Sequence, residues 1–338
     1  MVFFVLTVLS EIKQLKMKMN KHFQKIFRVT SFLVIVTLIL SSCNSKKNDR
    51  HSDTPTTGSI QISVDETFQP VIESEIPVFE GIYTQAKIKA VYEPEVDAFN
   101  NLLKDSVRLI VVSRGLSLKE KEFFLSKKFY PKEVKIALDG IAIITNKSNP
   151  DTLLTMEQLR KILLGEIKTW KQINPKSKFG PIKTVFDNKN SSTIRFVVDS
   201  ITNTGKLGTN LAALQHNKEV LDYVEQHPGS IGLIGVSWIS DTNDSTQLSF
   251  LKKVNVMSIS REDIAEEKNS FPPLQAYIND GRYPLTRSVW MINSDPHLGL
   301  ATGFLSFVSS VRGQKIILKT GIMPNTMPVR VVKLKDDL

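Results

Sequence analysis

Residues on which metal sites and common catalytic motifs depend are scarce in this sequence. Cys43 is the only cysteine among 338 residues, and the histidines show no metal-ligand spacing, so the sequence predicts no zinc site. The five histidines are His22, His51, His216, His227 and His297. Gly235-Val-Ser-Trp238 lacks the closing glycine of a nucleophile elbow, and Gly205-Lys206 lacks the first glycine and the hydroxyl residue of a nucleotide-binding loop. We therefore expect no metal, no cofactor and no enzymatic activity.

A dominant charge is also missing from most of the chain. The formal net charge is +10, but six Lys/Arg and one acidic residue lie in the first 43 positions, which leaves a net charge of +5 for the rest. No block of Lys and Arg of the kind that follows a phosphate backbone is present, so we expect no nucleic-acid partner. The length and the 41% hydrophobic content suit two domains with a proper core.

A basic segment and a short apolar run mark the N-terminus. Basic residues from Lys16 to Arg28 precede an apolar run at 31–40. That run is too short to span a bilayer, and its position is typical of a secretory signal. The sequence therefore predicts a signal peptide over 1–43, with residues 1–16 an over-extended start ahead of the true one.

The end of this signal indicates a lipid anchor. Leu40-Ser-Ser-Cys43 resembles a bacterial lipobox, in which the signal is cut before a cysteine that is then acylated; an incidental cysteine is the alternative. We expect a lipoprotein of the cell envelope, held to a membrane through Cys43 and facing the periplasm. Residues 44–58 contain no apolar side chain and are predicted to form a flexible tether.

From about residue 59 the pattern alternates between strands and helices, which predicts an α/β fold. The expected strands are 60–64, 86–92, 107–112, 136–145 and 231–239, with an extended segment at 283–292. The expected helices are 71–79, 96–103, 155–165, 217–226 and 303–318. A polar stretch at 240–249 predicts a surface loop.

One polar turn stands out because a strand ends there and a helix begins. Apolar residues recur at helical spacing after Ile194, so Ser191, Ser192 and Thr193 fall in the first turn, where backbone N–H groups lack intrahelical partners. Such a helix start can bind an oxyanion, and Arg195 would add a bidentate donor. The alternative is ordinary helix capping.

Two further positions lie at the ends of predicted strands. Thr67 is at the start of the first helix, and Ser113 and Arg114 follow the buried strand 107–112. Ligands of open α/β sheets bind at the carboxyl ends of the strands. These residues therefore join the candidate site.

A series of segments then identifies a family resemblance. They are Asp139-Gly-Ile-Ala-Ile-Ile-Thr-Asn146, Leu154-Thr-Met-Glu-Gln158, Gly165-Glu-Ile-Lys-Thr-Trp170, Pro228-Gly-Ser-Ile-Gly232, Tyr283-Pro-Leu-Thr-Arg287 and Phe304-Leu-Ser-Phe-Val308. Together they resemble PstS-like phosphate-binding proteins of ABC transporters over about 59–330. The resemblance implies a two-domain type II periplasmic-binding-protein fold, with a ligand cleft between the domains and two crossing strands as hinge. Domain I would comprise 59–137 and 286–338, and domain II 138–285.

The resemblance also implies which loops hold the ligand. The family's first loop is similar to Thr67-Phe68, its second to Ser113-Arg114, and its third to Ser191-Ser-Thr193. Asp187 stands where the family often has a phosphate-clamping arginine, and Ser113 stands where some members have an aspartate. Arg114 and Asp187 would restore a cation and an acceptor from opposite sides of the cleft, or else pair with each other.

The function implied is capture of inorganic phosphate and its delivery to an ABC permease by a monomeric binding protein. The alternatives are another oxyanion, or a sensory or surface lipoprotein that uses the same fold for a protein partner. Hinging is expected near 137–140 and 283–288. The residues expected at the phosphate are Thr67, Phe68, Ser113, Arg114, Asp187, Ser191, Ser192, Thr193 and Arg195.

Overall fold

The computed structural model describes residues 11, 14, 53–240 and 251–326. Residues 51–338 form one compact unit, and the description below concerns that unit. Apart from residues 11 and 14, the predicted signal peptide with Cys43 lies outside the described residues, as do the tether up to residue 52 and the loop at 241–250. No helix among the described residues is long and apolar enough to cross a bilayer.

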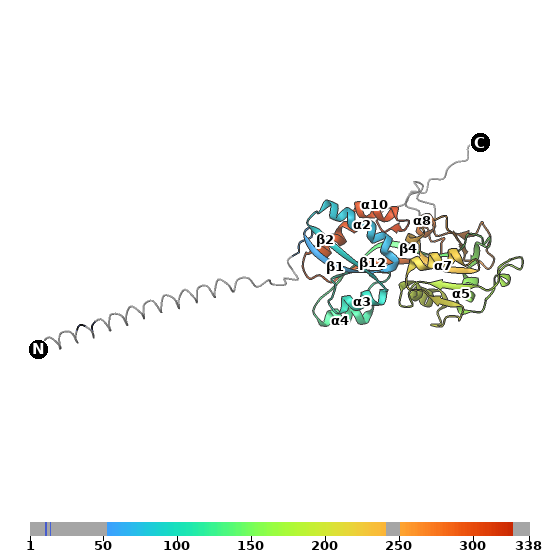
Figure 1. The fold of residues 1–338 in the computed structure, drawn as a ribbon, viewed down its shortest axis with the longest axis horizontal. Helices are drawn as coiled ribbons and strands as arrows, with labels where there is room; N and C mark the ends of the chain where they lie inside the picture. Colours follow the sequence, from blue (N-terminus) through green and yellow to red (C-terminus); the bar gives the residue numbers. More distant parts are fainter. Residues whose placement is uncertain (1–10, 12–13, 15–52, 241–250, 327–338) are drawn as a thin grey trace, which may run out of the picture. The chain divides into compact units, whose positions relative to one another are not determined.

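The first lobe is a mixed sheet with helices on both faces (Figure 1). Its strand order is β2-β1-β3-β12-β4. The strands are β1 (Gly58–Asp65), β2 (Ala86–Glu93), β3 (Leu109–Val112), β12 (Thr286–Asn293) and the first part of β4 (Lys132–Asn146), with β13 (Met323–Pro324) beside β4. The helices are η2 (Glu66–Phe68), α2 (Gln69–Ile82), α3 (Glu95–Leu103), α4 (Leu118–Ser126), α9 (Leu300–Ser309) and α10 (Val311–Lys319).

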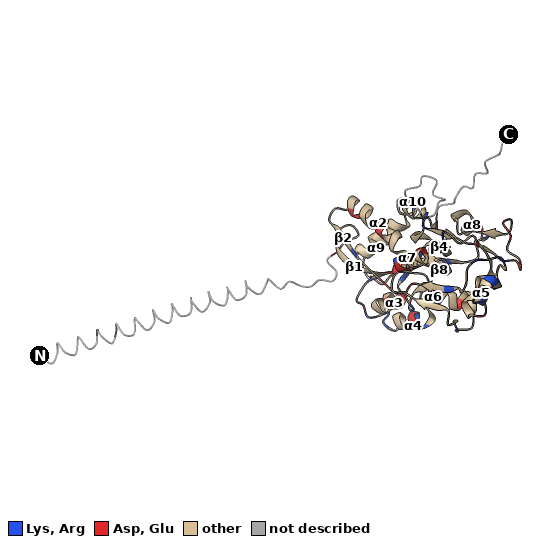
Figure 2. Ribbon diagram, turned by 45° about the vertical axis from the view of Figure 1, so that its right-hand side comes forward, with Lys and Arg blue, Asp and Glu red and all other residues tan. Residues whose placement is uncertain are grey.

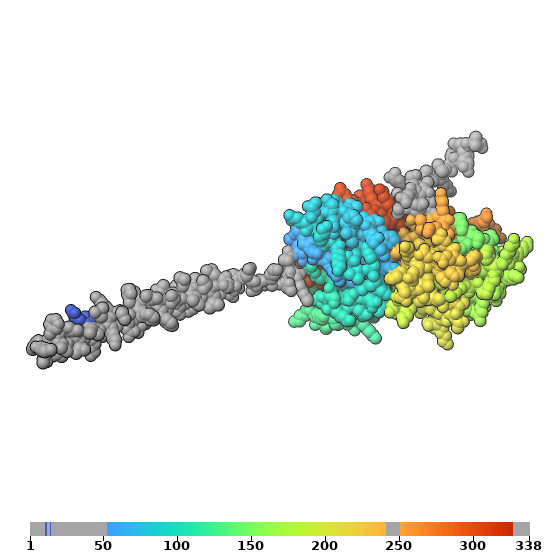
Figure 3. All heavy atoms as spheres, in the orientation of Figure 1, coloured from blue at the N-terminus to red at the C-terminus, as the bar shows by residue number. Residues whose placement is uncertain are grey.

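The second lobe continues from the far end of β4 in the order β4-β8-β6-β7. Its strands are β6 (Lys183–Phe186), β7 (Leu211–Ala213), β8 (Ser230–Gly235) and β9 (Val254–Val256), with a small separate sheet of β5 (Leu153–Thr155), β10 (Ser258–Ser260) and β11 (Ser270–Phe271). Its helical segments are α5 (Met156–Leu164), η3 (Trp170–Gln172), α6 (Ser192–Phe196), η4 (Val197–Thr202), α7 (Asn217–Gln226), η5 (Val236–Trp238) and α8 (Gln275–Asn279). In Figure 3 the first-lobe residues in blue and cyan meet the second-lobe residues in yellow along one boundary.

The strand β4 connects the two lobes without a break. It pairs with β12 from Lys132 to Gly140 and with β8 from Ile141 to Thr145. The chain returns beside it through the segment before β12, where the Ile141 amide donates to the Leu285 carbonyl at 2.9 Å. The Tyr283 hydroxyl donates to the Ile141 carbonyl at 2.5 Å. Two adjacent backbone segments thus cross between the lobes where the sequence predicts hinges.

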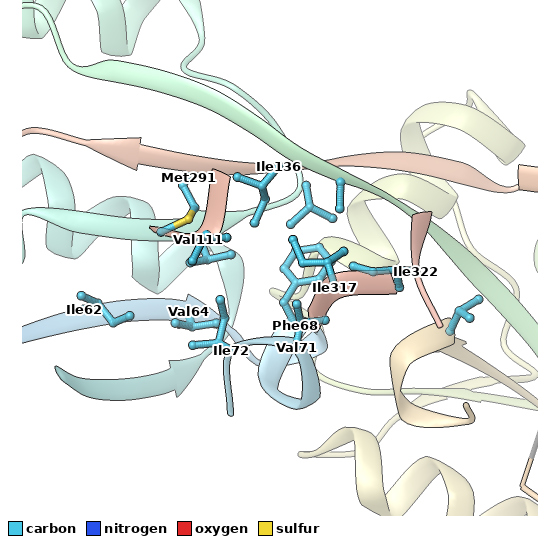
Figure 4. Packing of buried hydrophobic residues seen from close by; sticks show 14 of the residues in the cluster. Ile62, Val64, Phe68, Val71, Ile72, Val111, Ile136, Met291, Ile317 and Ile322 are labelled. Carbon is cyan, nitrogen blue, oxygen red and sulfur yellow. The ribbon is translucent and has the colours of Figure 1, made fainter. Parts of the chain in front are cut away.

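Apolar side chains fill both faces of the first-lobe sheet because its central strands are buried between helices. Ile62, Val64 and Val111 pack with α2 and α10 on one face (Figure 4). On the other face, Ile110 and Val112 pack with α3 and α4. In the second lobe successive residues of β4 point to opposite faces of the sheet. Ala142 and Ile144 pack in the cluster that contains α7, and Ile141 and Ile143 pack in the cluster that contains α5.

Some predicted boundaries need correction. The helix expected at 303–318 is two helices, because the backbone is extended at Ser310, whose hydroxyl caps α10 by accepting from the Gly313 amide. The strand expected at 231–239 ends at Gly235, where a 3-10 turn begins. Part of the predicted tether is held on the fold: Asp53 accepts from the Leu300 amide at 2.6 Å and pairs with Arg108 at 3.0 Å.

Candidate functional site

A single buried arginine lies where the crossing strand β12 meets the start of α6. Arg287 is 5% exposed, and its Nη1 donates to Ser192 Oγ at 2.7 Å. Its Nε donates to Asp139 Oδ2 at 3.0 Å. Nη2 lies 3.0 Å from the same carboxylate oxygen, yet its N–H groups make no hydrogen bond with a described residue. The guanidinium therefore keeps donor capacity beside the first turn of α6.

The predicted first loop closes over this arginine from the first lobe. The Phe68 ring lies with its centroid 5.1 Å from the Arg287 guanidinium carbon, within the range of a cation–π contact. Thr67 Oγ1 lies 3.5 Å from Ser192 Oγ and donates to Asp65 Oδ1 at 3.0 Å. Phe68 and Thr67 are fully buried. We call Arg287, Asp139, Ser192, Thr67 and Asp65 the Arg287 cluster.

Three buried carboxylates surround this one guanidinium. Burial, together with the nearby charge of Glu95, raises the pKa of Asp65 to about 6 against the opposing effect of Arg287. Burial raises the pKa of Asp187 to about 7; the hydrogen bond from Ser191 opposes this, while the charge of Asp65 adds to it. Burial also raises the pKa of Asp139, although Arg287 beside it favours the ionised form. Near neutral pH the site therefore holds both protonated carboxyl groups, which can donate a hydrogen bond, and ionised ones, which can accept one.

Several buried polar atoms at the site have no partner among the described residues. They are Asp65 Oδ2, Asp139 Oδ1, Thr193 Oγ1 and Asn217 Oδ1. A buried polar atom without a hydrogen bond costs about 1 to 3 kcal/mol. Two of these four atoms, on Asp65 and Asp139, belong to the Arg287 cluster, so unpartnered acceptors occur together with a guanidinium that keeps donor capacity.

Ser191 behaves as the capping alternative predicts. Its hydroxyl accepts from the Ile194 amide at 3.4 Å and donates to Asp187 Oδ1 at 2.6 Å. Asp187 is 1% exposed, and its other oxygen accepts from Asn217 Nδ2 at 3.3 Å. Ser191 thus fixes the start of α6 and Asp187 together, whereas Ser192 contacts Arg287.

Two predicted ligand residues instead form a second cluster with Glu95. Arg195 Nε donates to Glu95 Oε2 at 2.6 Å, and its Nη2 donates to Ser113 Oγ at 2.6 Å. The Ser113 amide and hydroxyl both donate to Glu95 Oε1 at 2.8 Å. We call these three residues the Glu95 cluster. It joins α6 of the second lobe to α3 and the end of β3 in the first.

Arg114 and Asp187 do not pair with each other, so the mutual pair given as one alternative is wrong. Arg114 makes two hydrogen bonds to Glu120, at 2.7 and 2.9 Å, and lies 3.6 Å over the Phe99 ring. Glu120 is the capping-box residue of α4, so its carboxylate is fixed close to Arg114. Local pairing therefore takes Arg114 away from the Arg287 cluster.

Sequence reasoning missed Arg287 and Asp139 as site residues. Both lie in strands whose other buried positions are mostly apolar, and both are almost fully buried. Charged residues are rarely buried unless they are paired. One signal was available in the sequence. One predicted crossing segment carries an acid, Asp139, and the other carries an arginine, Arg287, and residues on two adjacent crossing strands can pair.

Metal binding finds no support in the described part of the chain, where no group of three or more His, Cys, Asp or Glu side chains could hold an ion. Charged residues of both signs are interspersed over the helices and strands (Figure 2). The site's chemistry is thus that of one guanidinium, hydroxyl groups and carboxyls.

Comparison with known proteins places this geometry in a family. The model of the PBP superfamily domain matches residues 49–312, and the chain belongs to that superfamily. The curated protein "Phosphate-binding protein PstS" of Borreliella burgdorferi is 24% identical over 296 residues, which covers 86% of this chain and 95% of that protein. The PstS of Staphylococcus saprophyticus is 26% identical over 259 residues, covering 76% and 77%.

Solved structures agree on the fold. A phosphate ABC transporter substrate-binding protein of Clostridium perfringens, solved with bound phosphate, aligns with a TM-score of 0.67 at 23% identity, covering 79% of this chain and 99% of that chain. A phosphate transport receptor of Vibrio cholerae aligns with a TM-score of 0.59 at 21% identity, covering 79% and 100%. The predicted resemblance and the two-domain type II fold are confirmed.

Proposed function

We propose that this protein captures inorganic phosphate outside the cytoplasmic membrane and delivers it to an ABC permease, without catalysing a reaction. The observation that carries the proposal is the Arg287 cluster, in which a buried guanidinium with free donors faces Ser192 and the start of α6. A guanidinium and helix-start N–H groups are the donors that bind tetrahedral oxyanions best. The PstS relatives and the phosphate-bound neighbour support the same ligand.

In this proposal Arg287 supplies the cation that Asp187 cannot. Asp139 orients the guanidinium through Nε, while Ser192, Thr193 and Thr67 provide hydroxyl groups. Phe68 covers the guanidinium from the first lobe. The cation of the site therefore comes from the crossing strand, not from the loop before α6.

The carboxyls would give the site its choice of anion. At neutral pH phosphate retains a proton that it can donate, whereas sulfate has none. An ionised Asp65 or Asp187 would accept a hydrogen bond from that P–O–H group. It would repel sulfate, which would cost sulfate binding a penalty of order 1 to 3 kcal/mol. Oδ2 of Asp65, which has no hydrogen-bond partner among the described residues, is the acceptor we assign to that role.

Calorimetric titration of the chain from residue 44 onward tests this, because that chain keeps the compact unit 51–338 whole. Phosphate should bind, and sulfate should bind more weakly. Asp187→Asn should weaken phosphate and narrow its margin over sulfate. If phosphate releases no heat and raises no melting temperature, the ligand assignment fails.

One observation favours a ligand-independent role as the second candidate. Arg287, Arg195 and Arg114 each pair with a carboxylate of the chain itself, so the fold does not need an anion to neutralise them. A surface or sensory lipoprotein that contacts a protein partner would fit that arrangement. A titration in which phosphate, sulfate and molybdate all fail to bind would favour this candidate.

The membrane attachment is proposed from Cys43 and the apolar run before it. A lipid on Cys43 would hold the protein at the envelope facing the periplasm, as a monomer within reach of a permease. Cys43→Ser should leave an unprocessed, unlipidated precursor in detergent partitioning. A fully processed Cys43→Ser protein that still partitions with membranes would rule the anchor out.

A further inference from the structure

The Glu95 cluster joins the two lobes through hydrogen bonds among its own three residues. Glu95 has a side chain 2% exposed and accepts three hydrogen bonds from two partners. Its partner Ser113 belongs to the same lobe, but Arg195 belongs to the other. Arg195 in turn uses Nε, Nη1 and Nη2 on Glu95, Asp199 and Ser113.

A second first-lobe carboxylate crosses to the other lobe close to the Arg287 cluster. Glu66 Oε1 accepts from the Asn217 amide at 3.1 Å, and its Oε2 lies 3.3 Å from His216 Nδ1. These two residues begin α7, whose N-terminal N–H groups favour a negative charge. The Trp238 indole N–H also crosses, to the Thr67 carbonyl at 3.0 Å.

These contacts exist only while the lobes are together. Separating the lobes would leave Glu95 with Ser113 alone and would leave Glu66 without its helix start. Hydrogen bonds between charged groups are about twice as strong as neutral ones, and those of Glu95 are shielded from solvent by its burial. They therefore stabilise the closed arrangement whether or not an anion lies against Arg287.

We propose that Glu95 and Arg195, assisted by Glu66, hold the lobes closed, and that Ser113 and Arg195 serve closure instead of contacting the ligand. Glu95 is then a positioning residue for the proposed phosphate site. Part of the closing free energy comes from the protein itself, so the closed form is well populated before phosphate binds. The effect on affinity rests on the proposed function, but the effect on closure does not.

Small-angle X-ray scattering of the chain from residue 44 tests closure directly. Arg195→Gln removes the crossing charge from a side chain that is 32% exposed, so the variant should fold. Its ligand-free radius of gyration should shift upward, and Glu95→Gln should give the same shift. The double variant Arg195→Gln with Glu95→Gln should have nearly the same radius of gyration as either single variant, because both substitutions break the same contact.

The matched control is Glu120→Gln, which breaks the Arg114 pair within the first lobe and should leave the radius of gyration unchanged. Phosphate affinity should fall roughly threefold to tenfold in Arg195→Gln, as expected when the binding-competent fraction falls by that factor. Saturating phosphate should return the radius to that of the wild type.

Two results would overturn the proposal. One is a ligand-free radius of gyration that is the same in Arg195→Gln, Glu95→Gln and wild type. The other is that Arg195→Gln loses as much phosphate affinity as an Arg287 variant does while its own radius of gyration stays unchanged. That result would make Arg195 a residue that contacts the ligand. If wild type binds no phosphate but the radii still shift, closure by Glu95 stands and only the phosphate assignment fails.

Discussion

Two arginines cross between the lobes, and they differ in what surrounds them. Arg195 is about one-third exposed and makes hydrogen bonds through three nitrogens to protein groups. Arg287 is nearly buried, and its Nη2 has no hydrogen-bond partner among the described residues. The sequence predicted Arg195, together with Arg114, as ligand donors. Our two proposals give the arginines other roles: Arg195, whose three nitrogens all bond to protein groups, holds the lobes together, and Arg287, whose Nη2 makes no hydrogen bond with a described residue, binds the ligand.

An unpartnered group alone does not define a site. Glu75 on α2 is fully buried with neither carboxylate oxygen paired to a described residue, and burial raises its pKa to about 9. It lies on the face of α2 that bears Val71, Ile72 and Phe79, and no ion pair of the described chain includes it. What distinguishes the Arg287 cluster is that a cation, hydroxyl groups and unpartnered acceptors come together.

The largest loss of phosphate affinity is expected when the Arg287 donors are removed. Arg287→Lys keeps the charge but loses the planar fork, and phosphate affinity should fall about 10- to 100-fold, since a hydrogen bond to a charged group contributes about 1.5 to 3 kcal/mol. Calorimetry measures this. Because Asp139 would be left poorly paired, the double variant Arg287→Met with Asp139→Asn is the control. It should regain melting temperature without regaining phosphate binding, whereas recovered binding would refute the role of Arg287.

The next effect concerns stability as a function of pH. The folded protein raises the pKa of Asp187 from 3.8 to about 7, so the native state binds this proton more tightly than the unfolded state does. The free energy of unfolding should therefore fall as pH rises from about 4 to 7, by up to about 4 kcal/mol from this group. Asp187→Asn should flatten that part of the curve in urea unfolding. An unchanged curve would show that Asp187 is ionised in the native state.

The smallest effect is expected from a hydroxyl group that contacts Arg287 without carrying charge. Ser192→Ala removes the acceptor at 2.7 Å from Nη1 and should weaken phosphate and sulfate alike, by roughly threefold to tenfold. A competition titration of phosphate against sulfate measures the ratio of the two affinities. A change in the ratio as large as that of Asp187→Asn would mean that Ser192, not the carboxyls, selects the anion.

Local patterns were sufficient to predict most of the fold. The capping box at Thr155 and the left-handed glycine at 165 begin and end a helix where expected. Periodicity failed at Ser310, because an apolar stripe continues across a break that a single capping serine introduces. Helical spacing describes a face, not the point at which the backbone turns.

The site was predictable only in part, for a different physical reason. Thr67 and Ser192 were predicted from strand ends and helix starts, which are local signals, and Phe68 from the family resemblance; the structure brings all three close to Arg287 or to each other. The partners of Arg195 and Arg287 lie 100 and 148 positions away in the chain, and no local pattern specifies which carboxylate each arginine meets. The tertiary fold decides that pairing, and with it which arginine remains free to bind.

A crystal structure of the chain from residue 44 grown with phosphate tests the central claim most directly. The account predicts one phosphate in contact with the guanidinium of Arg287 and with Ser192 and Thr193, while Arg195 stays paired with Glu95 and Ser113. A phosphate held by Arg195 and Ser113, with Arg287 still bonded only to Asp139 and Ser192, would contradict it.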